Sequence, residues 1–521
     1  MALSPVTVGF SIFTAAPLIY LLYVAVWPFL ASLPLRRKLR GLPGPPATSL
    51  LLGNVPSLIG APIQQVLAKW AEQYGRVFKA IVLLDPEAIT QMLKVERFEK
   101  LTKAYGNMEK LTLDTQPNML TEPTGPYYRA IRKAVTPAFS TANLRAFFPT
   151  LVALTERVMG HLAASGSQVP QDMDRVAQRL TIDVIGRFAF DRDFDATGFG
   201  RNEALEAVSD LMTALQLMMN PLNRWFWWRK EARGLVAARR RYDVLVRRAL
   251  EDLRDKPPAE HCLLSHLMTL IDPNTGKPLS PKRLRCETAL FWIAGFETTA
   301  HAIGWTLMYI ASNPEAEEAL AAELDAAGLL AAPGRPAPRP LTWSDLGSLR
   351  YLNAAIQEGL RLMPPASGGT ARVCPKDTVL AGHTIPKGAM VWVPLYAMQR
   401  STRVWGPDAE KFRPERWLSG QASAAGSGAD AAETDDVVKA AGALSARGWL
   451  PFSEGPRQLR GDVDWPCWSC GPRWRCCAAD FRFKLADEMG GVEGAVADAR
   501  QRITLKPGDK GLLIHVIPRA P

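Results

Sequence analysis

Along much of the chain, apolar residues recur every three to four positions, the spacing that places them on one face of an α-helix. Polar and charged residues fill the positions between, so each such segment has one face to bury and one to expose. The clearest segments span residues 155–166, 178–190, 203–219 and 234–253. This pattern predicts a protein built mainly from α-helices.

Strand signals are fewer, and they occur at residues 378–385, 389–395 and 503–517. The last of these is predicted to form a hairpin that turns at Pro507, Gly508 and Asp509. Residues 69–79 run into the apolar segment 80–84 with no turn signal between them, which predicts that a hairpin is missing there. The predicted fold class is mainly α with small β-sheets.

Residues 8–35 form an uncharged apolar stretch, long enough to cross a bilayer as a helix. The basic run 36–40 follows at once and favours a cytosolic location for the rest of the chain. We therefore expect residues 1–40 to be a single-pass membrane anchor, and the Pro-rich residues 41–50 to be a stiff hinge. A cleaved signal peptide is the alternative, but no basic residue precedes the stretch and no small-residue cleavage site ends it.

The segment 285–310 predicts a buried helix that carries an acid and hydroxyls, Glu297, Thr298 and Thr299. Burying such groups without partners costs about 1–3 kcal/mol each, so their presence indicates a function. We expect Gly295 to open the helix locally, so that the Thr298 hydroxyl turns toward a cavity instead of bonding back to the preceding turn. A polar notch at a helix crossing is the alternative.

Glu358 and Arg361 lie three residues apart in a segment that ends at two prolines, so they share one face of a predicted helix. Arg416 lies further along, in the sequence FRPERW. Because a planar guanidinium binds a carboxylate at two points, these three residues are predicted to form a buried ion network. A solvated surface pair is the alternative.

With these motifs in order, the chain resembles the cytochromes P450, specifically the membrane-anchored, microsomal haem-thiolate monooxygenases of eukaryotes. The resemblance rests on an ordered set of sequences: the anchor, LPGPP, YRAIR, AGFETT, ExxR, PERW and PFSEGPR at residues 451–457. It implies one large helical domain with a minor β region over residues 51–521, with haem b as cofactor. Residues 331–340 and 420–448, rich in small and polar residues, are expected to be flexible surface insertions.

The resemblance also implies a reaction, the insertion of one atom of O2 into a lipophilic small molecule, with Thr298 and Glu297 delivering protons. Electrons would come from NADPH through NADPH–cytochrome P450 reductase at the endoplasmic reticulum membrane. The formal net charge of +11 suits an acidic partner or anionic lipid, and no nucleic-acid motif is present. Gln399 is a further candidate neighbour of the haem propionates. The residues implied to contact haem are Tyr128, Arg132, Arg372, Phe452, Gly455 and Arg457.

One departure from the family falls at the haem iron. The pattern FxxGxRxCxG matches Phe452, Gly455, Arg457 and Gly461, but Leu459 stands where the axial cysteine is required. A Leu side chain has no lone pair for iron, whereas a thiolate donates electron density to it. As written, the chain therefore should not form an ordinary haem-thiolate centre, and no other metal ligand is assigned.

The anomaly continues through residues 458–480, where positions 461–478 hold four of the seven cysteines and three tryptophans. Zinc is one explanation, but the adjacent Cys476 and Cys477 are poorly spaced to complete a tetrahedron with Cys467 and Cys470. Disulfides are disfavoured in a reducing cytosol. We favour a shifted reading frame, because a one-base shift of suitable codons for residues 458–461 yields Asn-Cys-Val-Gly. Sequence in the original frame then resumes at Phe481.

Three functional hypotheses remain. The first is a competent monooxygenase whose coding frame is shifted, and it accounts for the presence of Thr298, Glu358, Arg361 and Arg457. The second is a haem-less, inactive membrane protein of the same fold, which the literal sequence predicts. The third is a zinc-containing variant.

Overall fold

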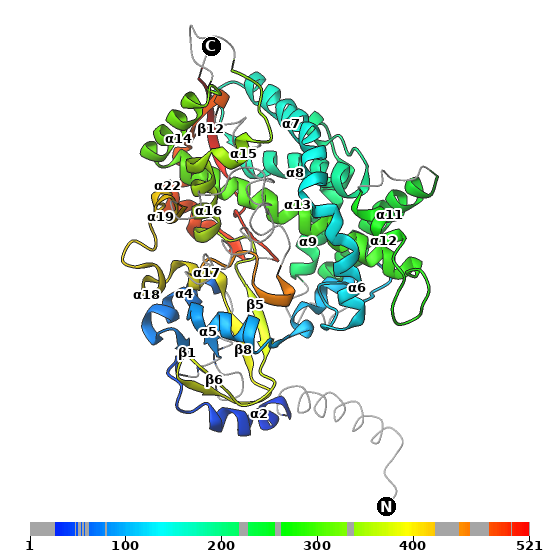
Figure 1. The fold of residues 1–521 in the computed structure, drawn as a ribbon, viewed down its shortest axis with the longest axis vertical. Helices are drawn as coiled ribbons and strands as arrows, with labels where there is room; N and C mark the ends of the chain where they lie inside the picture. The colour runs from blue at the N-terminus through cyan, green and yellow to red at the C-terminus, as the bar shows by residue number, and fades with distance from the viewer. Residues whose placement is uncertain are drawn as a thin grey trace, which may run out of the picture.

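The structure is a computed structural model. It describes residues 27–46, 48–49, 54, 57, 62–78, 81–217, 228–255, 262–330, 338–421, 448–458, 479–501 and 503–519. Helices surround the central helix α13 (Pro281–Ala311), and a smaller β-rich part lies at one end of the molecule (Figure 1). Each part has its own hydrophobic core. The prediction of a mainly α fold with small β-sheets is confirmed.

The helices begin at residues that suit helix starts. Ser280 precedes α13 and accepts a hydrogen bond from the Arg283 N–H, and Pro281 takes the first helical position. Asp172 caps α8 (Met173–Phe190) in the same way. The four segments with helical periodicity lie in α7 (Thr141–Ala164), α8, α9 (Glu203–Leu217) and α11 (Lys230–Asp255), as far as these are described.

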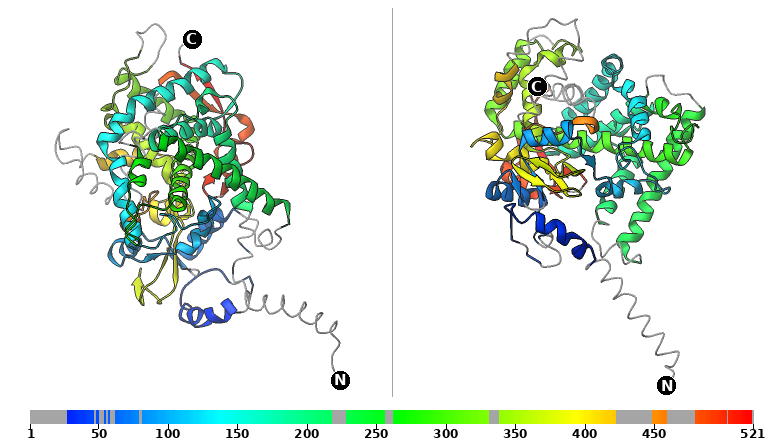
Figure 2. Two further views of the ribbon diagram at one scale, coloured as in Figure 1. Left: turned by 90° about the vertical axis from the view of Figure 1, so that its right-hand side faces the viewer. Right: turned by 60° about the horizontal axis from the view of Figure 1, so that its bottom comes forward.

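The other helices complete the two parts of the fold. Those of the N-terminal half are α2 (Trp27–Lys38), α4 (Ile63–Tyr74), α5 (Pro86–Thr90), α6 (Pro126–Val135) and α12 (Leu263–Met268). Those of the C-terminal half are α14 (Pro314–Ala326), α15 (Asp345–Ser348), α16 (Arg350–Leu362), α17 (Leu395–Arg400), α18 (Thr402–Trp405), α19 (Glu415–Gln421) and α22 (Gly491–Asp498). Helix α2 lies against the β-rich part (Figure 2), where Lys38 Nζ is 3.6 Å from Asp377 Oδ2.

The largest sheet has the strand order β1-β2-β8-β5-β3. Its strands are β1 (Val77–Phe78), β2 (Val82–Leu83), β8 (Met390–Val393), β5 (Thr370–Val373) and β3 (Glu99–Lys100). A second sheet, β4-β12-β9, joins β4 (Gln171–Asp172), β12 (Leu513–Pro518) and β9 (Phe481–Leu485). Two hairpins pair β6 (Thr378–Leu380) with β7 (His383–Ile385), and β10 (Arg500–Gln501) with β11 (Leu505–Lys506).

Two predictions about strands are wrong. The C-terminal segment does not form a hairpin on itself, because β11 pairs with β10 whereas β12 pairs with β9 and β4. The buried side chains of β12 pack in the helical core beside those of β9, a partner that the local turn residues do not reveal. At the N-terminal side, β1 and β2 do form an antiparallel hairpin. Its connection includes Ile81 at φ +45°, an unusual value for a β-branched residue, so no Gly or Pro marks the turn.

Several predictions fall mainly outside the described residues. These are the anchor at residues 8–35, the insertions 331–340 and 420–448, Leu459 and the four cysteines that follow it. Within the described ranges, no helix is both long and apolar enough to cross a membrane. The same ranges contain no cluster of His, Cys, Asp and Glu side chains suited to a metal ion.

Candidate active site

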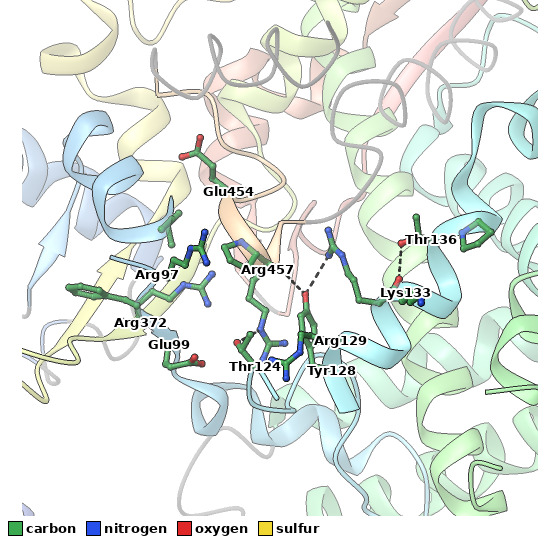
Figure 3. A pocket seen from close by; sticks show the side chains of 15 residues that line it. Arg97, Glu99, Thr124, Tyr128, Arg129, Lys133, Thr136, Arg372, Glu454 and Arg457 are labelled. Carbon is green, nitrogen blue, oxygen red and sulfur yellow. Dashed lines mark hydrogen bonds between the residues drawn. The ribbon is translucent and has the colours of Figure 1, made fainter. Parts of the chain in front are cut away.

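A cavity of about 760 Å³ lies between α6, the β3–β5 strand pair and residues 454–457 (Figure 3). Its lining is strongly basic, with six cationic side chains against two carboxylates. The charged lining residues are Arg97, Glu99, Arg129, Arg132, Lys133, Arg372, Glu454 and Arg457. Such a site favours a ligand with several negative charges.

The pairing of β3 with β5 places two cations side by side, because Lys100 is directly opposite Arg372. Like charges opposite one another destabilise a sheet. Arg372 is 2 % exposed, and its Nε and Nη1 atoms have no hydrogen-bond partner among the described residues. Burial, together with Arg457 and Arg372, lowers the pKa of Lys100 to about 7. An anion bound between these residues would remove the repulsion and satisfy the guanidinium.

Arg457 reaches the same cavity from the opposite wall. Its guanidinium carbon lies 3.6 Å from the centre of the Tyr128 ring, and its Nε donates to Thr124 Oγ1 at 3.0 Å. The Tyr128 hydroxyl donates to the Pro456 carbonyl at 3.1 Å, and Arg132 Nη1 lies 3.5 Å from that hydroxyl (Figure 3). The structure thus brings together four of the six residues that the resemblance implied to contact haem: Tyr128, Arg132, Arg372 and Arg457.

Gly455 allows the loop before Arg457 to approach the chain closely. It has φ +76°, and a Cβ atom there would lie 2.5 Å from the Leu93 carbonyl oxygen. Phe452 packs edge-on against Trp449, with ring centres 6.1 Å apart. These contacts fix the loop up to Gln458, and Leu459 lies outside the described residues.

Helix α13 has one accessible face within an otherwise buried stretch. From residue 286 to residue 310, only Phe291, Ala294, Gly295 and Thr298 are not buried, and their spacing places them on a single stripe. We call these four residues the open stripe. Its side chains are small or apolar apart from the Thr298 hydroxyl.

The expected opening of α13 at Gly295 is wrong, because the helix is continuous from Pro281 to Ala311. A Cβ atom on Gly295 would lie 2.5 Å from Ile185 Cδ1, so the glycine instead allows α8 to pack closely against α13. Thr298 Oγ1 donates to the Ala294 carbonyl at 2.7 Å, which is the back-bonded arrangement that we did not expect.

Glu297 is buried and faces away from the open stripe, so the structure does not bring its carboxylate to the Thr298 hydroxyl. Neighbouring residues of a helix point about 100° apart around its axis. Glu297 Oε1 instead lies 3.8 Å from His301 Nε2, while His301 Nδ1 lies 2.7 Å from Asp174 Oδ1. The sequence analysis missed His301, although a histidine four residues after an acid in an apolar helix would have been a usable signal.

The Glu358, Arg361 and Arg416 network is present and buried. Glu358 accepts hydrogen bonds from Arg361 Nε and Nη2 and from Arg416 Nε, each at 2.8 Å. The carboxylate also accepts from the Trp417 indole at 2.9 Å. These bonds tie α16 to α19 and to the segment before it.

Gln399 takes no part in the basic cavity. Its amide nitrogen donates to the carbonyls of Leu360 and Arg361 at 3.1 and 3.0 Å, and its amide oxygen accepts from the Leu450 N–H at 2.9 Å. The expectation that it neighbours the propionates is therefore wrong, because its polar atoms are already used for structural bonds.

Comparison with known protein families identifies the fold. The family model described as "Cytochrome P450" matches residues 43–458. The chain belongs to the cytochrome P450 family. The match ends one residue before Leu459, at the point where the sequence departs from the P450 haem-loop pattern.

Relatives of this P450 agree with that assignment. The chain is 27% identical over 445 residues to "Cytochrome P450 monooxygenase 128" of Postia placenta, covering 74% of this chain and 78% of the relative. It is 23% identical to "Putative cytochrome P450 CYP13A1" of Caenorhabditis elegans, covering 84% and 86%. It is 24% identical to a "Bifunctional cytochrome P450/NADPH--P450 reductase" of Bacillus cereus, covering 93% of this chain and 43% of the relative. The protein is thus an enzyme of the haem monooxygenase class.

The residues of the basic cavity fit haem, which carries two carboxylates. The unpartnered guanidinium of Arg372 and the opposed Lys100 supply the positive charge that these carboxylates need. The sequence analysis missed Lys100, because no local feature distinguishes it from a surface lysine. Only the pairing of β3 with β5 brings it beside Arg372 of the cavity, where its Nζ donates to the Leu120 carbonyl at 3.0 Å.

Proposed function

We propose that this P450 inserts one atom of O2 into a lipophilic small molecule, with electrons from NADPH delivered by NADPH–cytochrome P450 reductase. The apolar character of the open stripe supports a lipophilic substrate. The Bacillus cereus relative is named as both a P450 and its reductase, which supports the electron source. The net charge of +11 favours an acidic electron donor over a basic one.

The observation that carries the proposal is the unmatched positive charge of the basic cavity. Lys100 and Arg372 are opposed on neighbouring strands, and the Arg372 guanidinium retains two unpartnered nitrogen atoms in the described structure. When bound, haem would supply the activation of O2. Arg372 and Arg457, which line the cavity, would neutralise its carboxylates, with Lys100 adding positive charge beside Arg372. The Tyr128 and Arg132 side chains would complete that side of the site.

Proton delivery is the proposed task of Thr298 and Glu297. The Thr298 hydroxyl donates its hydrogen to Ala294, but its oxygen keeps a lone pair that can accept a hydrogen bond from water on the open stripe. Glu297 would supply protons to that water after its side chain turns from the interior of the protein. The two residues thus act from adjacent faces of α13.

The axial ligand is the part of the site that this sequence does not provide, and we propose a shifted reading frame over residues 458–480. The family match stops at residue 458. At β9, Phe481, Phe483 and Leu485 are buried and the strand pairs with β12, as expected where the original frame resumes. Sequencing the transcript across codons 450–485 tests this proposal, and an unshifted read would refute it.

We also propose that residues 1–40 anchor this P450 in the endoplasmic reticulum membrane, with the catalytic domain in the cytosol. The support is the uncharged stretch 8–35 and the basic run that follows it. Alkaline extraction of membranes tests the anchor. The full chain should stay in the pellet, and a variant without residues 1–40 should be released.

The carboxylate-binding role of the cavity can be tested without an axial ligand, by titrating the full chain with protoporphyrin IX, which has the same two carboxylates but no iron. We expect the porphyrin to bind, and its dimethyl ester to bind at least about tenfold more weakly, since one charge-assisted hydrogen bond contributes about 1.5–3 kcal/mol. Arg372→Met should weaken binding of the diacid but leave the ester unaffected. Arg201→Gln, a control at an exposed arginine, should change neither. Equal affinities for diacid and ester would refute the assignment.

A further inference from the structure

His301 is a buried imidazole placed between two carboxylates, and the haem cavity does not include it. It is 1 % exposed and lies in α13, four residues after Glu297. Its Nδ1 is 2.7 Å from Asp174 Oδ1, and its Nε2 is 3.8 Å from Glu297 Oε1. The ring therefore joins the interior side of α13 to α8.

Asp174 is held firmly, which fixes the direction of the His301 ring. Asp174 lies at the start of α8, and its Oδ2 accepts from Gln178 Nε2 at 2.6 Å. Asp172, which caps the same helix, accepts from the Leu512 N–H at 3.0 Å and so ties this end of α8 to the residues before β12. With Nδ1 bound to Asp174, Nε2 can only face Glu297.

The facing atoms, His301 Nε2 and Glu297 Oε1, are 3.8 Å apart, which is longer than a hydrogen bond. Within the described part of the chain, His301 Nε2 and the second carboxylate oxygen, Glu297 Oε2, have no hydrogen-bond partner. Buried polar atoms normally find partners, so an open donor opposite an open carboxylate marks a contact that a small side-chain rotation or one water completes. The contact between His301 and Glu297 can therefore form and break, whereas the hydrogen bonds to the Glu358 carboxylate are all made.

The two neighbouring carboxylates favour the protonated, imidazolium form of His301. Burial by itself lowers the pKa of His301, but the charge and hydrogen bonding of Asp174 and Glu297 outweigh it and raise the pKa to about 9. Helices α8 and α16 and strand β9 pack against α13, as do α11, α12 and α14. The other charged residues of α8, β9 and α16 are exposed or bound elsewhere: Arg175, Arg179, Asp183, Arg187, Arg350, Glu358, Arg361, Arg482 and Lys484. The charges that act on His301 are those of Asp174 and Glu297.

We propose that His301 is a positioning residue that holds the Glu297 carboxylate on the interior side of α13, with Asp174 fixing the imidazole. The inference rests on the proposed role of Glu297 as a proton donor, because His301 then controls when that carboxylate is free to turn toward Thr298. If His301 served only to join α8 to α13, its hydrogen bond to Asp174 would be sufficient and Glu297 would not be needed. The coupling between His301 and Glu297 is therefore what must be measured.

The direct test is an NMR titration of the histidine ring nitrogens in the full chain without cofactor. The chain has six histidines, so His301→Gln assigns the His301 signal by its loss. We expect Glu297→Gln to lower the His301 midpoint by about one pH unit, the usual effect of removing an opposite charge within about 4–6 Å. Asp174→Asn should lower it further. Glu287→Gln, a matched change in the same helix, should leave the midpoint where it is.

A His301 midpoint that is the same in Glu297→Gln as in Glu287→Gln would overturn the proposal. This result does not depend on haem, so it is distinct from failure of the proposed function, which would appear as absent porphyrin binding. In the haem-loaded chain with the cysteine restored, peroxide released per NADPH consumed should depend on pH differently in His301→Gln and in the unsubstituted chain. An identical pH profile would show that His301 does not act on Glu297 during turnover.

Discussion

Glu358→Gln gives the most decisive test of the buried ion network. The carboxylate is fully buried and accepts five hydrogen bonds: from Arg361 Nε and Nη2, Arg416 Nε, the Arg413 N–H and the Trp417 indole. A glutamine has the same shape but no charge. Its NH2 group is a hydrogen-bond donor, and it would point at the N–H donors that now bind the carboxylate oxygen. The substitution thus leaves the buried Arg361 guanidinium without a counter-charge, whereas Arg416 keeps Asp408, whose Oδ2 lies 3.4 Å from its Nη2.

The expected loss of stability follows from that arrangement. Removing one partner of a buried ion pair costs about 3–5 kcal/mol, because the remaining charge stays buried without compensation. Arg361 is itself fully buried and also donates to the Gln399 and Ala409 carbonyls, so it cannot turn outward to water. The cost should therefore lie at the upper end of this range.

The assay is urea unfolding of the full chain, followed by far-UV circular dichroism. Glu206→Gln is the control, because Glu206 pairs with Arg201 in solvent and such pairs contribute at most about 1 kcal/mol. We expect a large downward shift of the midpoint for Glu358→Gln and almost none for Glu206→Gln. A loss below about 1 kcal/mol for Glu358→Gln would show that the network does not stabilise the fold as argued.

Three further predictions concern other sites. Burial raises the pKa of Glu287 to about 7 despite hydrogen bonds from Met119 and Tyr127, so the folded chain binds more protons there than the unfolded chain. The free energy of unfolding should fall by about 3 kcal/mol as pH rises from about 4.5 to 7. In urea unfolding, Glu287→Gln should remove this dependence on pH, and an unchanged dependence would show that Glu287 is not its cause. Because the pKa of Lys100 is about 7 in the free protein, binding of protoporphyrin IX at pH 8 should take up close to one proton. Calorimetry in two buffers of different ionisation enthalpy measures this uptake, which Lys100→Met should abolish; uptake that persists in this variant would place the proton elsewhere. Gly455→Ala should destabilise the chain by about 1–3 kcal/mol, since its φ is +76° and the new Cβ would meet the Leu93 carbonyl. Gly382→Ala, with φ +78° but no neighbour within 4 Å, isolates the backbone strain, and an equal effect of the two changes would show that the contact with Leu93 does not matter.

Local patterns were sufficient to predict much of this fold. The spacing of apolar residues predicts the long helices. An acid and a base three residues apart, followed later by PERW, predict the Glu358 network. Arg372 and Arg457, which the motif resemblance implied to contact haem, both line the basic cavity. These features depend on short segments of chain.

The features that sequence reasoning missed depend on contacts between distant segments. The position of Lys100 beside Arg372 depends on the register of β3 against β5. Strand β12 pairs with β9 and not with β11, which is nearer in the sequence. The sequence also does not show in which direction a side chain points. Glu297 and Thr298 were identified as a pair by type, yet α13 turns one inward toward His301 and the other toward the open stripe. Likewise, the close approach of Ile185 explains Gly295 better than any opening of the helix does.

This chain is a P450 that carries Leu459 where the family's haem-loop pattern requires the axial cysteine. The most direct test is the difference spectrum of the reduced protein with carbon monoxide, for the chain as written and for a chain carrying Gln458→Asn, Leu459→Cys and Arg460→Val. We predict the red-shifted band of a ferrous thiolate haem only in the substituted chain. The band in the chain as written would mean that another cysteine binds the iron. If neither chain shows it, the haem-less, inactive membrane protein of the same fold becomes the better description.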